Sequence, residues 1–143
     1  MRCQIVADAR LGRIVHPVQV SEESATRNPN QMEIVEAMVT DPAFNHVSFD
    51  ISWDEVAKYA VATPESIKRV ATTLNKYPDR FVFGTDTVAP AGPGPYFAVF
   101  DMWAPVFRLL TPDASLKVRK GNYERLFDEG RRKVRAWEKA NVQ

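Results

Sequence analysis

The sequence predicts an α/β fold in which short parallel strands alternate with helices. Three short apolar segments have the character of buried strands, and each is followed by sequence with helical spacing. A β-α-β-α-β-α order with right-handed crossovers gives a parallel sheet. Two architectures satisfy this order: a small open α/β sheet, and a piece of a (β/α)8 barrel, of which 143 residues would supply about three units.

The first two strands are predicted in the N-terminal third of the chain. Residues Cys3–Ala7 (CQIVA) form a short apolar run that leads into a polar loop. Apolar side chains at helical spacing then predict a helix over Gln31–Thr40. In Asn45–Ser52 (NHVSFDIS) apolar and polar residues alternate, which is the pattern of a strand. A helical stretch over Trp53–Ala60 completes the second unit.

The third unit has the clearest local signals. Thr63-Pro64-Glu65 predicts a helix start, with Thr as the N-cap, Pro in the first turn and an acidic residue behind it. Arg80–Gly84 (RFVFG) follows as a strand that is apolar on both faces, as strands of parallel sheets are. The polar residues Thr85 and Asp86 end it, and residues 87–95 (TVAPAGPGP) form a loop.

The C-terminal part is predicted to be helical. The aromatic-rich stretch Tyr96–Leu110 forms a helix that Pro105 kinks or divides, and Thr111-Pro112-Asp113 starts a short one. Asn122 caps or precedes a last helix, whose basic second half is interpreted as a solvated helix face rather than a phosphate site. Five apolar residues share one face of that helix: Tyr123, Leu126, Phe127, Val134 and Trp137.

Composition bounds the class of protein without identifying a ligand. The chain is 45% hydrophobic and 26% charged, with 19 Lys and Arg against 18 Asp and Glu, which gives a formal charge of +1. This balance gives no support to a nucleic-acid or acidic-lipid partner. The single Cys3 cannot form an internal disulfide, and no apolar run is long enough to span a bilayer. We therefore expect one soluble, cytoplasmic domain over residues 1–143 that acts on a small molecule.

The ends of the predicted strands contain the candidate functional residues. Asp8, Asp50 with Ser52, and Asp86 directly follow the three apolar runs. In parallel α/β folds the active site lies at the C-terminal ends of the strands, although loop acids also cap helices and bind backbone amides. Asp86 is the strongest candidate for a metal ligand or general base, because Gly84 before it lets another group approach the backbone closely.

Other catalytic motifs are missing from the sequence. His16 and His46 are the two histidines, and neither is spaced with a second His or Cys as a metal pair would be. The sequence contains no P-loop, Gly-rich phosphate loop or Ser-centred nucleophile elbow. Nucleotide binding therefore has no support.

Three segments, taken in order, resemble the closing third of the amidohydrolase-related proteins. They are HVSFDISW, NKYPDRFVFGTD and GNYERLFD, and the likeness extends over about residues 1–130. In that family strand eight ends in a Gly-Thr/Ser-Asp, as in Gly84-Thr85-Asp86, and a terminal helix contains an Asn…Arg-Leu-Phe like Asn122 and residues 125–127. The resemblance implies an α/β fold that is part of a TIM-like (β/α)8 barrel, with about three βα units of parallel strands and C-terminal helices.

The resemblance also implies a function for Asp86. The strand-eight aspartate of these metal-dependent hydrolases binds the catalytic divalent metal, zinc or manganese, or takes a proton from the metal-bound water. Ser52 and Thr85 would contact the substrate beside it. The segment IVADARLGRIVHP resembles the strand-six region, where the family has a His, so that Asp8 becomes a second candidate metal ligand.

Two further expectations follow from the resemblance. The family's His-x-His metal ligands would lie upstream of Met1, so the chain is expected to be active only when another chain or segment completes the barrel. Two alternatives stay open. One is a metal-dependent decarboxylase of the same superfamily, which acts on an aromatic or unsaturated acid in a pocket lined by Trp53, Tyr96 and Phe97. The other is a non-catalytic remnant that oligomerises through exposed sheet edges. In each case we expect a homo-oligomer or a complementing chain.

Overall fold

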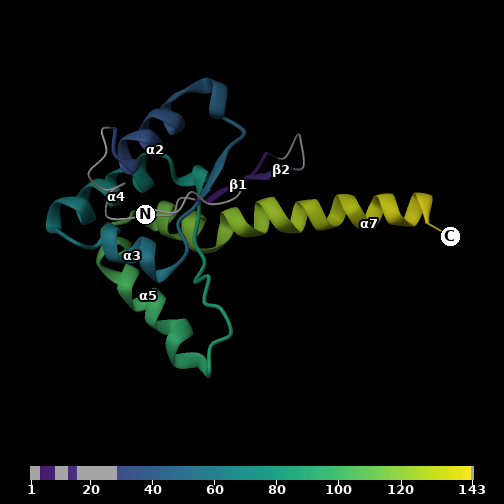
Figure 1. Cartoon of the computed structure of the whole chain (residues 1–143). Helices are drawn as coiled ribbons and strands as arrows, with labels where there is room; N and C mark the ends of the chain where they lie inside the picture. The colour runs from purple at the N-terminus through teal and green to yellow at the C-terminus, as the bar shows by residue number, and fades with distance from the viewer. Residues whose placement is uncertain (1–3, 9–12, 16–28, 143) are drawn as a thin grey trace.

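The computed structural model of the chain describes residues 4–8, 13–15 and 29–142, with side chains from residue 29 onward (Figure 1). It is mostly helical, with four short strands. The strands are β1 (Gln4–Asp8), β2 (Arg13–Val15), β3 (Ser48–Asp50) and β4 (Phe81–Val82). The helices are α2 (Gln31–Thr40), α3 (Asp54–Ala60), α4 (Pro64–Lys76), α5 (Pro93–Phe107), α6 (Pro112–Leu116) and α7 (Glu129–Asn141). Single 3-10 turns lie at Pro42–Phe44 and Pro78–Arg80, and π-helical turns at Lys117–Gly121 and Glu124–Asp128.

The four strands form one sheet in the order β2-β1-β3-β4. Strands β3 and β4 are parallel, with Phe49 opposite Phe81. Strand β1 is antiparallel to β3, with Gln4 opposite Asp50, and it is also antiparallel to β2. The prediction of three parallel βα units is therefore wrong for the first strand, and the sheet is not closed into a barrel. Apolar runs predict that a strand exists, whereas its direction depends on which strand it pairs with.

Local signals set the helix starts as expected. Asn30 accepts a hydrogen bond from the backbone N–H of Glu33, whose carboxylate accepts one from the Asn30 N–H in return. Thr63 and Ser66 form the same reciprocal pair at the start of α4, and Pro64 occupies the first helical position. Helix α5 runs through Pro105 and ends two residues later, so this proline does not divide it.

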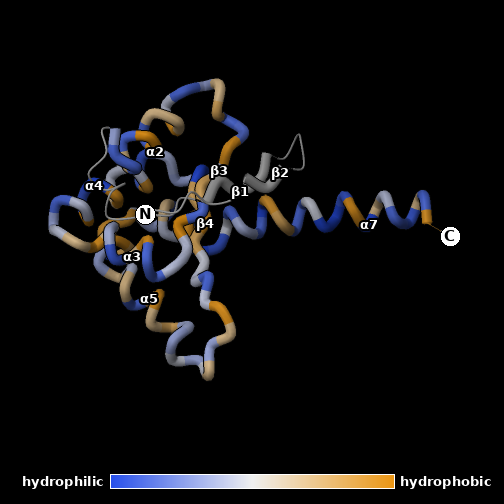
Figure 2. The backbone as a smooth tube through the Cα atoms, viewed as in Figure 1, coloured by the Kyte–Doolittle hydropathy of each residue, from blue (hydrophilic) through white to orange (hydrophobic). Residues whose placement is uncertain are grey.

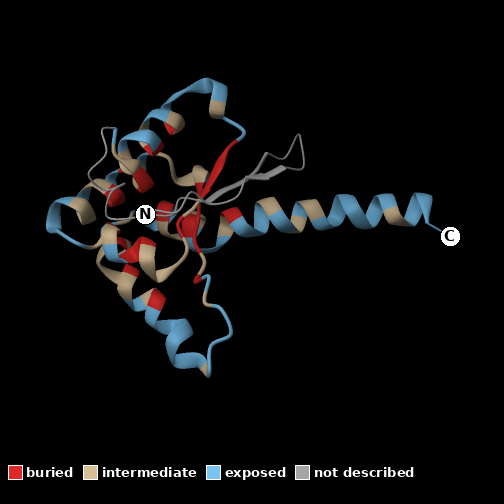
Figure 3. Cartoon of the chain, in the orientation of Figure 1, coloured by how far each residue is buried: buried red, intermediate tan, exposed pale blue. Residues whose placement is uncertain are grey.

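The core lies between the parallel strands and the helices that cover them. Phe49 and Phe81 are buried side by side, and the Phe83 ring packs edge-on against Phe100 and Phe107 of α5 at centroid distances of 4.9 and 5.0 Å. Figure 3 shows the buried residues gathered where the strands meet these helices. Not all aromatic residues of α5 belong to the core, because the side chain of Phe97 is 58% exposed. The largest fully buried side chains are Trp103, Phe49, Phe81, Leu74, Val56, Val106, Val118 and Asn122.

The outer edge of β4 is covered by the helical segment that precedes α7. The backbone N–H of Phe83 donates to the carbonyl of Val118 at 3.0 Å. The Asn122 side chain, 1% exposed, donates to the carbonyls of Phe81 and Pro78 at 2.8 and 2.7 Å. Asn122 was expected to cap or precede the last helix, but its backbone is helical and its amide instead satisfies one carbonyl of β4 and one of the 3-10 turn before it.

Helix α7 extends away from the rest of the molecule (Figure 1). Its surface is mainly hydrophilic, with isolated hydrophobic residues along it (Figure 2). Tyr123, Phe127, Val134 and Trp137 of the predicted apolar face are all exposed, between 44% and 62%. The basic residues of α7 are also exposed, as predicted. None of the described helices is long and apolar enough to cross a membrane.

Candidate functional site

The candidate site lies where the chain leaves the carboxyl ends of β3 and β4. From β3 the chain passes through Ser52 and Trp53 into α3, and from β4 it passes through Gly84 and Thr85 to Asp86. Trp53 and Asp86 both have positive φ values, of 88° and 48°. Such backbone conformations are uncommon for residues other than glycine and concentrate at functional sites. Two residues with this uncommon backbone conformation thus follow the ends of two adjacent parallel strands.

Asp50 and Ser52 form a compact pair beside Asp86. One carboxylate oxygen of Asp50 accepts hydrogen bonds from the Ser52 hydroxyl and from the Ser52 backbone N–H, the latter at 2.8 Å. Burial raises the pKa of the Asp50 carboxyl above its ordinary value. The bonds from Ser52 act in the opposite direction, and the negative charge of Asp86 adds to the rise. The charges of Asp50 and Asp86 thus act on each other at the ends of these two strands.

Gly84 allows the two strand ends to approach each other. A Cβ placed on Gly84 would lie 2.7 Å from the Ser52 Oγ, closer than real Cβ atoms come to another atom. Any larger residue at position 84 would therefore displace the Ser52 hydroxyl from the Asp50 carboxylate. The close approach expected at Gly84 is present, and the group that approaches is the side chain of Ser52.

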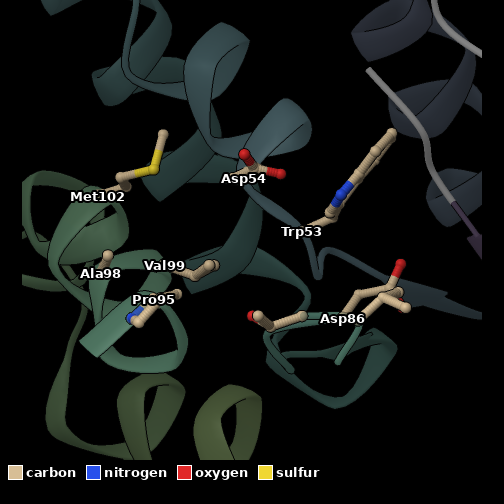
Figure 4. A pocket seen from close by; sticks show the side chains of 9 residues that line it. Trp53, Asp54, Asp86, Pro95, Ala98, Val99 and Met102 are labelled. Atoms are coloured by element: carbon tan, nitrogen blue, oxygen red, sulfur yellow. The ribbon is translucent and has the colours of Figure 1, made fainter. Parts of the chain in front are cut away.

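A cavity of about 360 Å³ opens beside these strand ends (Figure 4). Three segments form it: the start of α3, the loop after β4, and one face of α5. In Figure 4 the α5 residues lie on one side, Trp53 and Asp86 on the other, and Asp54 between them. Its volume is within the range of small-molecule sites. The lining residues are Trp53, Asp54, Asp86, Thr87, Val88, Pro95, Ala98, Val99 and Met102.

The structure brings some of the predicted site residues together and separates others. Asp86 and Trp53 line the cavity. Ser52 lies behind it, bonded to Asp50, and Thr85 is buried at 6% exposure next to Asp86. Asp8 ends β1, whose antiparallel register places its backbone about 13 Å along the strand from the residue opposite Asp50. Asp8 and Asp86 thus lie toward opposite ends of the sheet, which the parallel prediction did not anticipate.

Part of the prediction concerns residues that the structure does not describe. The side chain of Asp8, and Cys3 and His16 altogether, lie outside the described residues. His46 is exposed near the start of β3, at the end remote from Asp86. Among residues 29–142 no three His, Cys, Asp or Glu side chains are grouped as a metal ion requires. Asp50 and Asp86 offer two carboxylates, fewer than the three protein ligands of a catalytic zinc site.

Sequence reasoning missed several residues of the cavity. The sequence around Asp54 indicates an ordinary acid in the first turn of a helix. In the structure its carboxylate does accept a hydrogen bond from the backbone N–H of Glu55, at 3.0 Å. Ala98, Val99 and Met102 have the spacing of one helix face. That spacing was visible, but nothing local indicates that the face borders the loop after β4.

The chain was compared with known proteins in three ways. It matches no protein-family model, no curated protein and no solved structure.

Proposed function

We propose that this chain forms part of the active site of a metal-dependent hydrolase of the amidohydrolase type, with Asp86 as its essential carboxylate. One observation supports this above the others: Asp50 and Asp86 lie at the carboxyl ends of adjacent parallel strands, and Asp86 lines a cavity of about 360 Å³. Active sites of parallel α/β folds lie at this edge.

Each residue of the strand ends has a distinct part in the proposal. Asp86 is exposed, so its carboxylate can bind a divalent cation or accept a proton from water. Asp50 is more deeply placed, and its hydrogen bonds hold the Ser52 hydroxyl beside Gly84. A bound zinc or manganese ion would lower the pKa of a coordinated water toward neutrality.

The described residues do not complete such a site. Two carboxylates can attract a divalent cation, but a catalytic metal needs at least one more protein ligand. A further segment or a complementing chain would have to supply it. We therefore expect weak metal binding by this chain and no catalytic step from these residues alone.

Paramagnetic broadening by Mn²⁺ tests the proposal directly. Amide NMR spectra of the ¹⁵N-labelled chain would be recorded while MnCl₂ is added. We expect selective loss of signal from residues 50–53 and 84–88, because broadening is strongest close to the ion. Asp86→Asn should remove this localised effect, since an amide is a poorer ligand than a carboxylate. Asn also adopts a positive φ like that of Asp86 more readily than Ala does.

Asp101→Asn is the matched control, since Asp101 is an exposed acid on α5 outside the cavity lining. It should leave the broadening pattern as it is in the unchanged protein. Broadening that is spread over all surface acids, or that survives Asp86→Asn, would refute the role of Asp86. The non-catalytic interpretation would then be favoured.

A further inference from the structure

We propose that the cavity beside Asp86 selects an organic cation, a small molecule with an amine or ammonium group attached to an apolar or aromatic body. This inference deepens the proposed function and depends on it for regarding the cavity as the substrate site. It rests on three properties of the lining: its charge, its polar atoms and its apolar surface.

The charge of the lining is negative. Asp54 and Asp86 contribute two carboxylates, and none of the described residues of the lining is a Lys, Arg or His. Asp50, outside the lining, adds a further acidic group whose pKa the charge of Asp86 raises. One turn beyond Asp54, Lys58 forms an ion pair with Glu55 rather than facing the cavity wall. A cation entering the cavity is therefore attracted, whereas an anion meets two like charges.

The polar atoms of the lining suit a hydrogen-bond donor. Carboxylate oxygens only accept hydrogen bonds, and an ammonium group only donates them. Thr87 adds a third acceptor: its Oγ1 is buried and has no hydrogen-bond partner among the described residues. Buried hydroxyls without partners are uncommon in folded proteins. If Asp86 is occupied by the metal of the proposed function, Asp54 and Thr87 remain to bind the ammonium group.

The apolar part of the lining suits the body of such a ligand. Pro95, Ala98, Val99 and Met102 form a continuous wall along α5, opposite Trp53 (Figure 4). Hydrocarbon gains free energy by leaving water for such a surface, and an indole ring attracts cations through its negative face. A ligand with one charged end and one apolar end would thus match both sides of the cavity.

The same features disfavour an aromatic acid, the substrate class of the alternative decarboxylase. No lining side chain among the described residues has a positive charge that could pair with a carboxylate, and two would repel it. The charge of the ligand therefore separates the two enzyme classes without any measurement of activity.

Binding of three ligands of similar size tests the inference. 2-Phenylethylamine, 2-phenylethanol and 3-phenylpropanoate would be titrated into the ¹⁵N-labelled chain at pH 7, with EDTA present to exclude metals. We expect the amine to shift amide signals of residues 53–54, 86–88 and the α5 wall, and to bind about tenfold or more tightly than the acid. Asp54→Asn should weaken amine binding by about threefold to tenfold, and Asp101→Asn should leave it unchanged.

Three outcomes would overturn the inference: equal or tighter binding of the acid, amine binding that is insensitive to Asp54→Asn, or shifts confined to residues outside the lining. The amide spectrum of each variant also shows whether it keeps its fold. Because this titration contains no metal and the Mn²⁺ experiment contains no amine, a failure of cation selection is distinguishable from a failure of metal binding at Asp86.

Discussion

Gly84→Ala tests whether the two strand ends are coupled through the Ser52 hydroxyl. The new methyl carbon would lie 2.7 Å from the Ser52 Oγ and 3.7 Å from the Ser52 Cβ. Only the first contact is too close, so the strain is relieved when the hydroxyl moves away. The hydroxyl and the backbone N–H of Ser52 both bond to the same Asp50 oxygen, which leaves the hydroxyl little freedom to move without losing its acceptor.

The size of the effect follows from the hydrogen bond that is lost. A hydrogen bond to a charged group contributes about 1.5–3 kcal/mol, so Gly84→Ala should lower the free energy of unfolding by about this amount. In a Ser52→Ala background the oxygen is absent, and the nearest remaining atom is at ordinary contact distance. There the same change should cost about zero, or stabilise by up to about 1 kcal/mol through reduced freedom of the unfolded chain.

Urea denaturation of the four proteins, followed by circular dichroism, gives the coupling energy of this double-mutant cycle. Gly94→Ala is the control, because a Cβ there meets nothing within 4 Å and the residue lies in the first turn of α5. It should be neutral or slightly stabilising. If Gly84→Ala costs the same with and without the Ser52 hydroxyl, the proposed contact does not limit the residue at position 84.

Two further changes test the burial of Asp50 and the role of Asn122. Burial raises the pKa of Asp50 above 3.8, so the stability that this group contributes is present below about pH 3.8 and is lost as the pH rises through its folded pKa. As the pH rises from about 3.5 to 7, Asp50→Asn should therefore become more stable relative to the unchanged protein. Urea denaturation at about five pH values measures this difference. A trend of opposite sign would contradict the raised pKa. Asn122→Asp removes the donor to the Phe81 and Pro78 carbonyls and should cost about 3 kcal/mol or more, whereas Asn141→Asp on exposed α7 should cost less than about 1 kcal/mol. Equal effects of the two Asn changes would show that the buried amide contributes nothing special.

Features of the fold with local causes could be predicted from the sequence. The Thr63-Pro64 start of α4 depends on residues within one turn, and the α2 boundaries follow from apolar spacing that ends at Asp41-Pro42. The direction of β1 could not be predicted in this way, because it depends on pairing between residues more than 40 positions apart. The same holds for Asn122, whose partners at Pro78 and Phe81 belong to a different element.

The site shows the same division. Asp86 was identified because it directly follows a strongly apolar strand, and the structure places it on the cavity wall. Asp54 was missed because a carboxylate in the first turn of a helix already has a local explanation. Only the packing of α5 against α3 and the loop after β4 shows that this acid also borders a cavity.

The cover over β4 has a consequence for how copies of the chain could associate. In a parallel pair, alternate residues direct their backbone groups outward, and at the end of β4 these groups include the Phe81 carbonyl and the Phe83 N–H. These two are already bonded, to Asn122 and Val118, so a foreign strand would find them occupied. A strand added to extend the sheet would have to displace Asn122 first, or else join beyond β2. One amide side chain and one helix carbonyl thus hinder the addition of a strand next to β4.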